Sequence, residues 1–389
     1  MTVSSETYRA PPFWRRPSVR GFLIQAGLVL GLVGAAWFFT SNAVANLAKN
    51  SLTTGFGFLW GNASFELGES ITGFAAGDSF LDAFYAGIAN TAAVSVISII
   101  AATILGVVIG ITRLSSNPLA RVLSGGYVEL VRNVPLILQM MFWYAVITRS
   151  LPSPRRALQP VEGVFLSNRG INFPTLQLDA LHLWMAFGLT ALLVIVLLLR
   201  RWAHVLKSPR LADVIRDPKL SLGLLLAILV LVAATASVDA PRIAGFNFRG
   251  GGSITPEFTA VFFGLTIYSA AFIAENVRSG ILGVARGQRE AASALGLRSG
   301  QIMRLIVLPQ ALRVVVPPLA SQYLNIVKNS SLAVAIGYPD IMRVATIIIS
   351  ESGKAIEVIA IIMAIYLTFS LIISYLMNIY NRTIMAKGG

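Results

Sequence analysis

The sequence has no cysteine, two histidines and few charged residues. Without cysteine, the 389-residue chain has no disulfide, no thiolate nucleophile and no cysteine-ligated metal site. His182 and His204 are far apart in the sequence, which favours interfacial residues over a pair of metal ligands. Charged residues make up 12% of the chain, against roughly 25% in soluble domains. With 56% hydrophobic residues, this composition predicts a polytopic membrane protein.

The motifs of ATP hydrolysis and of other catalysis are also missing. The sequence has no Gly-x-x-x-x-Gly-Lys-Ser/Thr phosphate-binding loop. The segment GVARGQRE (283–290) has two glycines but lacks the Lys and Ser/Thr that would reach phosphate and magnesium. Paired carboxylates, catalytic triads and metal-ligating clusters are absent from the sequence as well. We therefore expect no metal site, no cofactor and no enzymatic activity of the chain's own.

Eight apolar stretches approach the roughly 20 residues that cross a bilayer as a helix. They are 22–42, 87–111, 127–148, 181–200, 220–238, 258–280, 311–336 and 357–380. The seventh contains Pro317-Pro318 and the polar run Lys328-Asn329-Ser330-Ser331, so we expect a broken span there. The fold class that follows is an all-α membrane protein with about eight transmembrane helices.

The first of these stretches has two interpretations. Four arginines between residues 9 and 20 precede the apolar run 22–39, and Ala43-Val44-Ala45 follows it, as in a cleavable signal peptide. The apolar run is longer than the usual signal-peptide core and long enough to span. We therefore favour an uncleaved first helix.

The positive charges predict how the chain is oriented. The net charge of +14 would suit a nucleic-acid partner, but in a membrane protein it indicates Lys and Arg kept in cytoplasmic loops. The segment 200–219, for example, carries six such residues. The expected cytoplasmic segments are 1–21, 112–126, 201–219, 281–310 and 381–389. Both termini would then be cytoplasmic, and no nucleic-acid partner is expected.

The cytoplasmic segment EAASALGLRSGQIMRLIVLP (290–309) predicts a short helix, a turn and a second helix. We expect Glu290 to begin the first helix, where a carboxylate meets unpaired N–H groups. The small residues Ala291 and Ala292 would allow another surface to approach closely. Gly296 would end the helix in a left-handed conformation.

The second part of this segment predicts how the turn continues into the next span. Ser299 would cap the second helix, and Pro309 would break it before that span. The result is either a rigid knob that docks into a partner's groove or an ordinary amphipathic helix at the membrane surface. The residue chemistry alone leaves both possibilities open.

The same segment resembles the EAA loop of binding-protein-dependent ATP-binding cassette (ABC) importer permeases. All seven fixed positions of that loop match, and they are Glu290, Ala291, Ala292, Gly296, Ile306, Leu308 and Pro309. Three further stretches resemble the polar amino-acid branch of the family, namely YVELVRNVPLILQ (127–139), YSAAFIAENVRSGI (268–281) and KNSSLAVAIGYPDI (328–341). The resemblance covers about 87–148 and 258–385.

The resemblance implies a function and a set of partners. The chain would be the translocation subunit of an ATP-driven L-amino-acid importer with a type I permease core. Its EAA loop would be a coupling helix seated in a cleft of the ATP-binding subunit, of which two copies would hold ATP and Mg²⁺. A second, related permease, in a heterodimer, and an extracytoplasmic solute-binding protein would complete the assembly. The chain would cross the bacterial inner membrane several times.

The sequence departs from the five-span core of that family at 149–256, where two extra spans, an inserted helical hairpin, are expected. This enlarged layout resembles the larger, Q-type subunit of general L-amino-acid importers. The segments would be 1–86 with the extra first helix, 87–148 and 257–389 as the two parts of the core, and 149–256 as the insertion. Within the insertion, Gly250-Gly251-Gly252 favours a turn over a strand interior.

Charged residues near the cytoplasmic ends of two spans are candidates for a gate. Glu129 and Arg132 are three residues apart, as are Glu275 and Arg278, so each pair shares one helical face. Cross-pairing between the two helices would lock the inner end of a pathway. The alternative is that these side chains extend individually to the interface.

Polar residues of the seventh span are candidates for the substrate path. They are Gln322, Asn325, Lys328, Asn329 and Ser331, with Tyr268 and Gln139 as weaker candidates from other spans. A substrate carboxylate would pair with Lys328 or with free N–H groups near Asn329, and amide carbonyls would bind the ammonium group. Hydrogen bonding between subunits would explain the same residues.

A self-sufficient secondary transporter or channel is the alternative function. Such a protein would need ion-coupling acids near the middle of the membrane and often contains inverted repeats. The sequence shows no inverted repeat. Its acidic residues lie at span ends or in loops and not near the middle of the membrane. A purely structural membrane scaffold would not account for the cytoplasmic knob.

Overall fold

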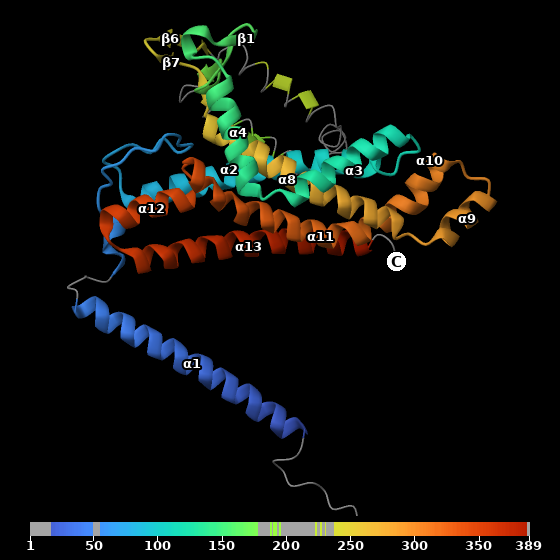
Figure 1. Ribbon diagram of the computed structural model, residues 1–389, viewed down its shortest axis with the longest axis horizontal. Coiled ribbons are helices and arrows are strands. Elements are labelled where there is room, and N and C mark those ends of the chain that lie inside the picture. The colour runs from blue at the N-terminus through green and yellow to red at the C-terminus, as the bar shows by residue number, and fades with distance from the viewer. Residues whose placement is uncertain are drawn as a thin grey trace, which may run out of the picture.

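The computed structural model describes residues 17–49, 55–177 and 237–386, with isolated positions between 187 and 230. The helices are α1 (Pro17–Lys49), α2 (Phe80–Thr112), α3 (Pro118–Asn133), α4 (Leu136–Ser150), α8 (Pro256–Leu282), α9 (Arg286–Ala294), α10 (Ser299–Ile302), α11 (Leu308–Asn329), α12 (Ile341–Ser352) and α13 (Ala355–Ala386). Long helices α2, α8, α11 and α13 form the body, and α9 and α10 lie at one end of it (Figure 1).

The prediction of a mostly helical membrane protein is confirmed, but the number of eight spans is not. Five helices among the described residues are long and apolar enough to cross a membrane. They are Arg20–Asn42, Phe80–Thr112, Pro256–Leu282, Ser299–Ile336 and Ala355–Arg382. The bent pair α3 and α4 would make a sixth. The predicted spans 181–200 and 220–238 lie almost entirely outside the described residues.

Glycines bring α2 and α8 together at the centre of the fold. A Cβ added at Gly106 of α2 would lie 2.7 Å from the Ile273 side chain of α8. One added at Gly110 would lie 2.7 Å from the Ala274 carbonyl oxygen. Small residues at such positions let helix backbones approach closely in membranes. This packing places the end of α2 beside the polar end of α8.

The predicted continuous span 127–148 is wrong, because the chain bends by 104° between α3 and α4. The bend falls at Val134-Pro135, and Val134 is extended, as a residue before proline prefers to be. The side-chain amide of Gln139 donates to the carbonyl oxygens of Val131 and Val134, both at 3.0 Å. Those carbonyls would otherwise be unpaired at the end of α3.

The predicted break at Pro317-Pro318 is also wrong. Helix α11 continues through both prolines to Asn329, and a short 3₁₀ helix, η5 (Ser330–Ile336), extends it. Proline already has helical φ, and membrane helices tolerate the loss of its hydrogen bond when neighbouring groups satisfy the freed carbonyl. The polar residues after Lys328 therefore lie on a continuing helix and not in an unwound segment.

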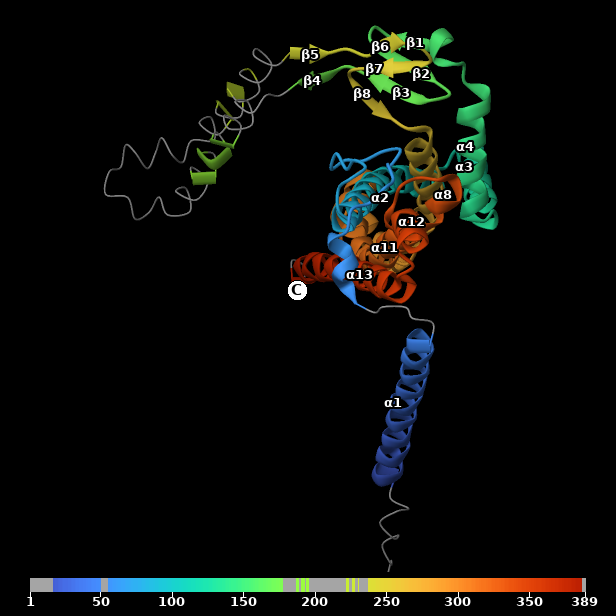
Figure 2. The same ribbon diagram turned by 90° about the vertical axis from the view of Figure 1, so that its left-hand side faces the viewer.

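Short antiparallel strands lie within the insertion 149–256. The all-α prediction did not contain these strands. A four-stranded sheet has the order β1 (Leu158–Val161), β2 (Val164–Ser167), β3 (Gly170–Phe173) and β8 (Gly252–Ile254). Two further pairs are β4 (Thr175–Gln177) with β5 (Ser237–Asp239), and β6 (Arg242–Ala244) with β7 (Asn247–Arg249). Figure 2 shows these strands gathered beyond the ends of α4 and α8. Strands of three or four residues leave little periodic pattern in a sequence.

The β3–β8 pairing joins two segments of the insertion that precede and follow its two predicted spans. Ile171 pairs with Ile254, and Phe173 pairs with Gly252. The predicted glycine turn is confirmed at Gly250 and Gly251, which have φ of +77° and +63°. Gly252 departs from the prediction because it begins strand β8. The turn therefore delivers the chain directly into the strand that precedes α8.

Candidate functional site

The segment 290–309 forms a helix, a turn and a second helix, as predicted, but with different boundaries. Helix α9 begins at Arg286, so Glu290 lies in its middle and not at its start. Glu290 and Ala291 are exposed, whereas Ala292 is buried. Arg289 donates to the Ile281 carbonyl oxygen and so holds α9 against the end of α8. Among the described residues, Glu290 has no hydrogen-bond or ion-pair partner, and its carboxylate remains available to another chain.

The turn after α9 is closed by the backbone alone. Gly296 has φ +76°, which confirms the predicted left-handed conformation. The N–H of Gly296 donates to Ser293 at 2.9 Å, and that of Leu297 donates to Ala292 at 3.2 Å. This pair of bonds is a Schellman motif, which satisfies the last carbonyls of a helix. It projects Leu295, which is 81% exposed, from the tip of the segment.

The second half of the segment runs into α11 without a break. Arg298, not Ser299, is the residue that precedes α10, and its N–H donates to the Gln301 side chain at 2.9 Å. Residues Met303–Val307 form a π-helical turn that leads directly into α11, and Pro309 is the second residue of α11. The predicted break at Pro309 is therefore wrong. Leu308 and Pro309 are exposed, and Ile306 is half-buried.

The charged residues predicted as a gate pair differently from the expectation. Glu275 forms ion pairs with Arg278, at 2.6 Å on the same helix, and with Arg113 at the end of α2. Glu129 and Arg132 on α3 are exposed, and the Arg132 guanidinium lies 4.9 Å from the centroid of the Phe272 ring. Neither pairs with the α8 charges among the described residues.

Arg113 is a residue that the sequence-based reasoning missed. It is the first charged residue after the apolar run 87–111, and that position at a span end was the available signal. Its pairing with Glu275 connects the ends of α2 and α8, the two helices that the glycines hold together. The end of the fold where α2 and α8 meet thus has a cluster of two arginines around one carboxylate.

The predicted substrate-path residues are distributed over α11 and η5. Asn325 and Lys328 are exposed, and Gln322, Asn329 and Ser331 are half-buried. Ser331 donates to the Lys328 carbonyl oxygen at 2.7 Å, which is a local helical contact. The two weaker candidates have packing roles, because Gln139 caps α3 and the Tyr268 ring lies 4.9 Å from that of Phe272.

A buried polar network, also missed from sequence, joins α2 to the connection between η5 and α12. Asn90 donates to the Pro339 carbonyl oxygen at 2.9 Å and to that of Glu69 at 3.0 Å. Tyr338 donates to the Asn90 carbonyl oxygen at 3.1 Å. Asp340 is fully buried, it caps α12 through the Arg343 N–H at 2.8 Å, and burial raises its pKa to about 7. A polar residue within an apolar stretch, such as Asn90 in 87–111, was the sequence signal for this network.

The comparisons with known proteins agree with this architecture. Residues 218–385 match the family described as "Binding-protein-dependent transport system inner membrane component". The chain is 42% identical to the putative amino-acid ABC transporter permease protein YhdX of Escherichia coli K12, over 99% of both chains. It is 41% identical to the general L-amino acid transport system permease protein AapQ of Rhizobium johnstonii, over 94% of this chain and 92% of that one.

A third relative is the glutamate/glutamine/aspartate/asparagine transport system permease protein BztB of Rhodobacter capsulatus, 37% identical over 92% of each chain. The crystal structure of an amino acid ABC transporter with histidines aligns with a TM-score of 0.47 at 22% identity, covering 78% of this chain and 95% of that one. The chain belongs to the amino-acid ABC transporter permeases. It is the membrane-spanning translocation subunit of an ABC importer, and ATP is hydrolysed by a separate subunit.

Proposed function

We propose that this chain passes L-amino acids, delivered by a solute-binding protein, across the bacterial inner membrane. The names of the full-length relatives support this substrate class, since they refer to general L-amino acid transport and to transport of glutamate, glutamine, aspartate and asparagine. Family membership also argues against the alternative of a self-sufficient secondary transporter or channel.

The coupling role is assigned to the α9–α10 segment. In this proposal, the segment is seated in a cleft of the ATP-binding subunit by Glu290, Ala291 and Ala292, and Gly296 fixes the shape of its turn. The connection from the segment into α11 is made by Ile306, Leu308 and Pro309. The observation that carries the assignment is that Glu290 is exposed and has no partner within the described part of the chain, and that the exposed Leu295 lies on the following turn, which is closed by its own backbone. A hydrophobic side chain that is 81% exposed at a rigid tip suits insertion into a partner.

The assembly would contain two ATP-binding subunits, a second related permease in a heterodimer, and a solute-binding protein. Both termini of this chain would be cytoplasmic, with the α9–α10 segment on the same side and the strands of 149–256 on the other. The division into 1–86, 87–148, 149–256 and 257–389 describes this arrangement, with the two core parts forming the pathway.

The pathway residues follow from exposure and charge. The candidates for contact with substrate on α11 and η5 remain Gln322, Asn325, Lys328, Asn329 and Ser331. Tyr268, on the neighbouring helix α8, is a further candidate. Gln139 would act by holding the bend between α3 and α4. The gate would consist of Arg113, Glu275 and Arg278, with Glu129 and Arg132 on the adjacent α3.

Reconstitution in liposomes tests the proposed function. We expect ATP-dependent uptake of radiolabelled L-glutamine and L-glutamate only when the ATP-binding subunit, the related permease and the binding protein are all present. Uptake by this chain without the ATP-binding subunit would contradict the proposal and favour a secondary transporter. Full transport without the second permease would contradict the heterodimer alone.

A further inference from the structure

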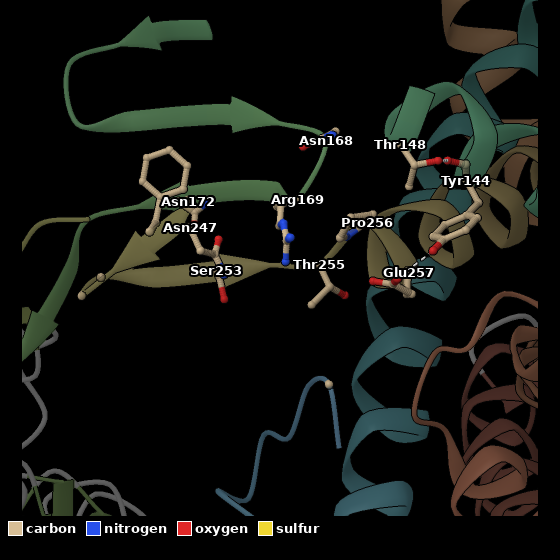
Figure 3. Close-up of a pocket in the computed structure, with 14 residues that line it drawn as sticks. Tyr144, Thr148, Asn168, Arg169, Asn172, Asn247, Ser253, Thr255, Pro256 and Glu257 are labelled. Atoms are coloured by element: carbon tan, nitrogen blue, oxygen red, sulfur yellow. Dashed lines mark hydrogen bonds between the residues drawn. The ribbon is translucent and has the colours of Figure 1, made fainter. Parts of the chain in front are cut away.

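A polar cavity of about 540 Å³ lies where the strands meet the ends of α4 and α8. The strand side contributes the β2–β3 turn, β7 and β8, and the helix side contributes Tyr144, Thr148 and Glu257. Figure 3 shows Arg169 on the strand side and Tyr144 with Glu257 on the helix side. Small-ligand sites commonly have volumes in this range and combine a few converging polar groups.

The lining of the cavity includes one basic and one acidic side chain, and both keep hydrogen-bonding capacity that contacts among the described residues do not satisfy. Arg169 is exposed, and its guanidinium has no ion pair or hydrogen bond among the described residues. One carboxylate oxygen of Glu257 accepts from the Tyr144 hydroxyl at 3.0 Å, which leaves the other oxygen open. The nearby Glu69 is already bonded to the Thr255 hydroxyl, and Asp239 accepts from the Gly251 N–H at 2.9 Å. Arg169 and Glu257 are thus the free charges of the lining.

Two amide side chains that line the cavity each have a buried atom without a hydrogen-bond partner among the described residues. In Asn172, which is 5% exposed, this atom is the side-chain nitrogen, and in Asn168 it is the side-chain oxygen. Because both atoms are buried, they lie behind the accessible surface of the cavity. The cavity therefore offers a cation and an anion to whatever enters it.

The backbone holds these groups in place. Asn168 and Arg169 are the two residues of the β2–β3 turn, between the paired residues Ser167 and Gly170. Gly170 has φ +104°, and a Cβ there would collide with the Ile254 carbonyl oxygen of β8. The turn is therefore pressed against β8, and Glu257 follows that strand in the first turn of α8. The backbone positions of Arg169 and Glu257 are therefore set by strand and helix elements, as a preorganised small-ligand site requires.

We propose that this cavity binds the main-chain zwitterion of an α-amino acid, with Arg169 bonded to its carboxylate and Glu257 bonded to its ammonium group. A lone anion or cation would leave one of the two charges unpaired, whereas a zwitterion satisfies both. The inference rests on the proposed function, because the strand side of the molecule must face the delivered substrate. The cavity is a transit site between the binding protein and the membrane pathway.

The test measures equilibrium binding of radiolabelled L-glutamine to the complete transporter in nanodiscs without the binding protein. We expect saturable binding that Arg169→Gln and Glu257→Gln each weaken roughly ten- to hundred-fold, the usual effect of losing one charge-assisted bond. Arg242→Gln is the matched control, since Arg242 is exposed on β6 and does not line the cavity. Arg169→Lys should retain part of the affinity. Both glutamine variants are expected to fold, because Arg169 has no partner to lose and glutamine at 257 still accepts from Tyr144.

Ligand analogues identify which charge each residue binds. L-glutaminamide lacks the carboxylate and should bind equally weakly to the wild type and to Arg169→Gln. N-acetyl-L-glutamine lacks the ammonium group and should bind equally weakly to the wild type and to Glu257→Gln. If L-glutamine binds both variants as well as the wild type, the transit site is overturned while the proposed function stands.

Two further outcomes separate the proposals. If the variants lose affinity for the solute-binding protein but bind L-glutamine normally, the cavity is a protein-docking surface, and the inference is overturned. If the wild-type complex transports no amino acid with all its partners present, the proposed function fails first and the transit site fails with it.

Discussion

Two polar regions of the molecule, one around Asn90 and Asp340 and the other in the α9–α10 segment, differ in what their side chains contact. Around Asn90 and Asp340, polar groups are buried and most of them are bonded within the chain. In the α9–α10 segment, Glu290 is exposed and has no partner among the described residues. Burying a polar group is costly unless it is paired, so the first region serves the fold. The second region holds its backbone by its own hydrogen bonds and presents its side chains outward, which is what an interface between subunits requires.

Replacing Asn90 with leucine should give the largest effect on stability. The Asn90 side chain donates to two carbonyl oxygens and accepts from the Ile71 N–H at 3.2 Å. Its loss leaves three backbone groups without this partner, one in a buried and two in partly buried hydrogen bonds, and an unpaired buried group costs about 1–3 kcal/mol. We expect the free energy of unfolding to fall by about 3 kcal/mol, measured by denaturant titration in detergent. The control is Asn325→Leu on the exposed face of α11, and equal stability of the two variants would contradict the role of the network.

Asp340 should make the stability depend on pH. Burial raises its pKa from the ordinary value of 3.8 to about 7, so the folded state binds a proton more tightly than the unfolded state. The stability is then complete below about pH 4, falls as pH rises from about 4 to about 7, and is constant above. The change amounts to a few kcal/mol, since each pKa unit corresponds to about 1.4 kcal/mol. Thermal unfolding between pH 4 and 8 measures it, and Asp340→Asn should flatten that part of the profile. An unchanged slope in the variant would show that another group titrates.

Substitutions in the α9–α10 segment should affect assembly but not folding. Glu290→Ala removes one charge-assisted contact, worth about 1.5–3 kcal/mol, and should weaken binding of the ATP-binding subunit roughly ten- to hundred-fold. Gly296→Val forces a β-branched residue into left-handed φ, at a cost of at least about 1 kcal/mol, and should distort the turn. Association is measured by titrating the purified ATP-binding subunit, and uptake is measured separately in liposomes.

The control for this pair is Ser299→Ala, which lies outside the fixed positions of the loop. Membrane insertion and binding of the solute-binding protein should be preserved in all three variants. Normal association together with normal uptake in Glu290→Ala and Gly296→Val would rule out the coupling role. Lost insertion would instead assign a folding role to the segment.

The sequence predicted local features better than pairings. Apolar length placed α2, α8 and α13, and glycine chemistry placed the left-handed turn at Gly296. The bend at Val134-Pro135 was missed because the run 127–148 is long enough, and apolar enough apart from its charged first part, to be interpreted as one helix. Continuation through Pro317 was missed because a proline's effect depends on what satisfies the freed carbonyl. The strand pairing of Ile171 with Ile254 joins residues far apart within 149–256 and depends on tertiary contacts alone.

The arginine cluster where α2 and α8 meet should give the smallest effect. Arg113 and Glu275 are only partly exposed, with side-chain exposures of 15% and 27%, but Arg278 also pairs with Glu275 and would replace part of the lost contact. We therefore expect Arg113→Gln to destabilise the chain by about 1 kcal/mol or less, since exposed ion pairs contribute little. A double-mutant cycle with Glu275→Gln measures the coupling directly and removes effects of either substitution alone. The same cycle between Arg132 and Glu275 is the control, because these two side chains form no ion pair in the described structure. A coupling energy near zero for Arg113 and Glu275 would remove Arg113 from the proposed gate, and an equal coupling for Arg132 would restore the pairing between α3 and α8 that the sequence first indicated.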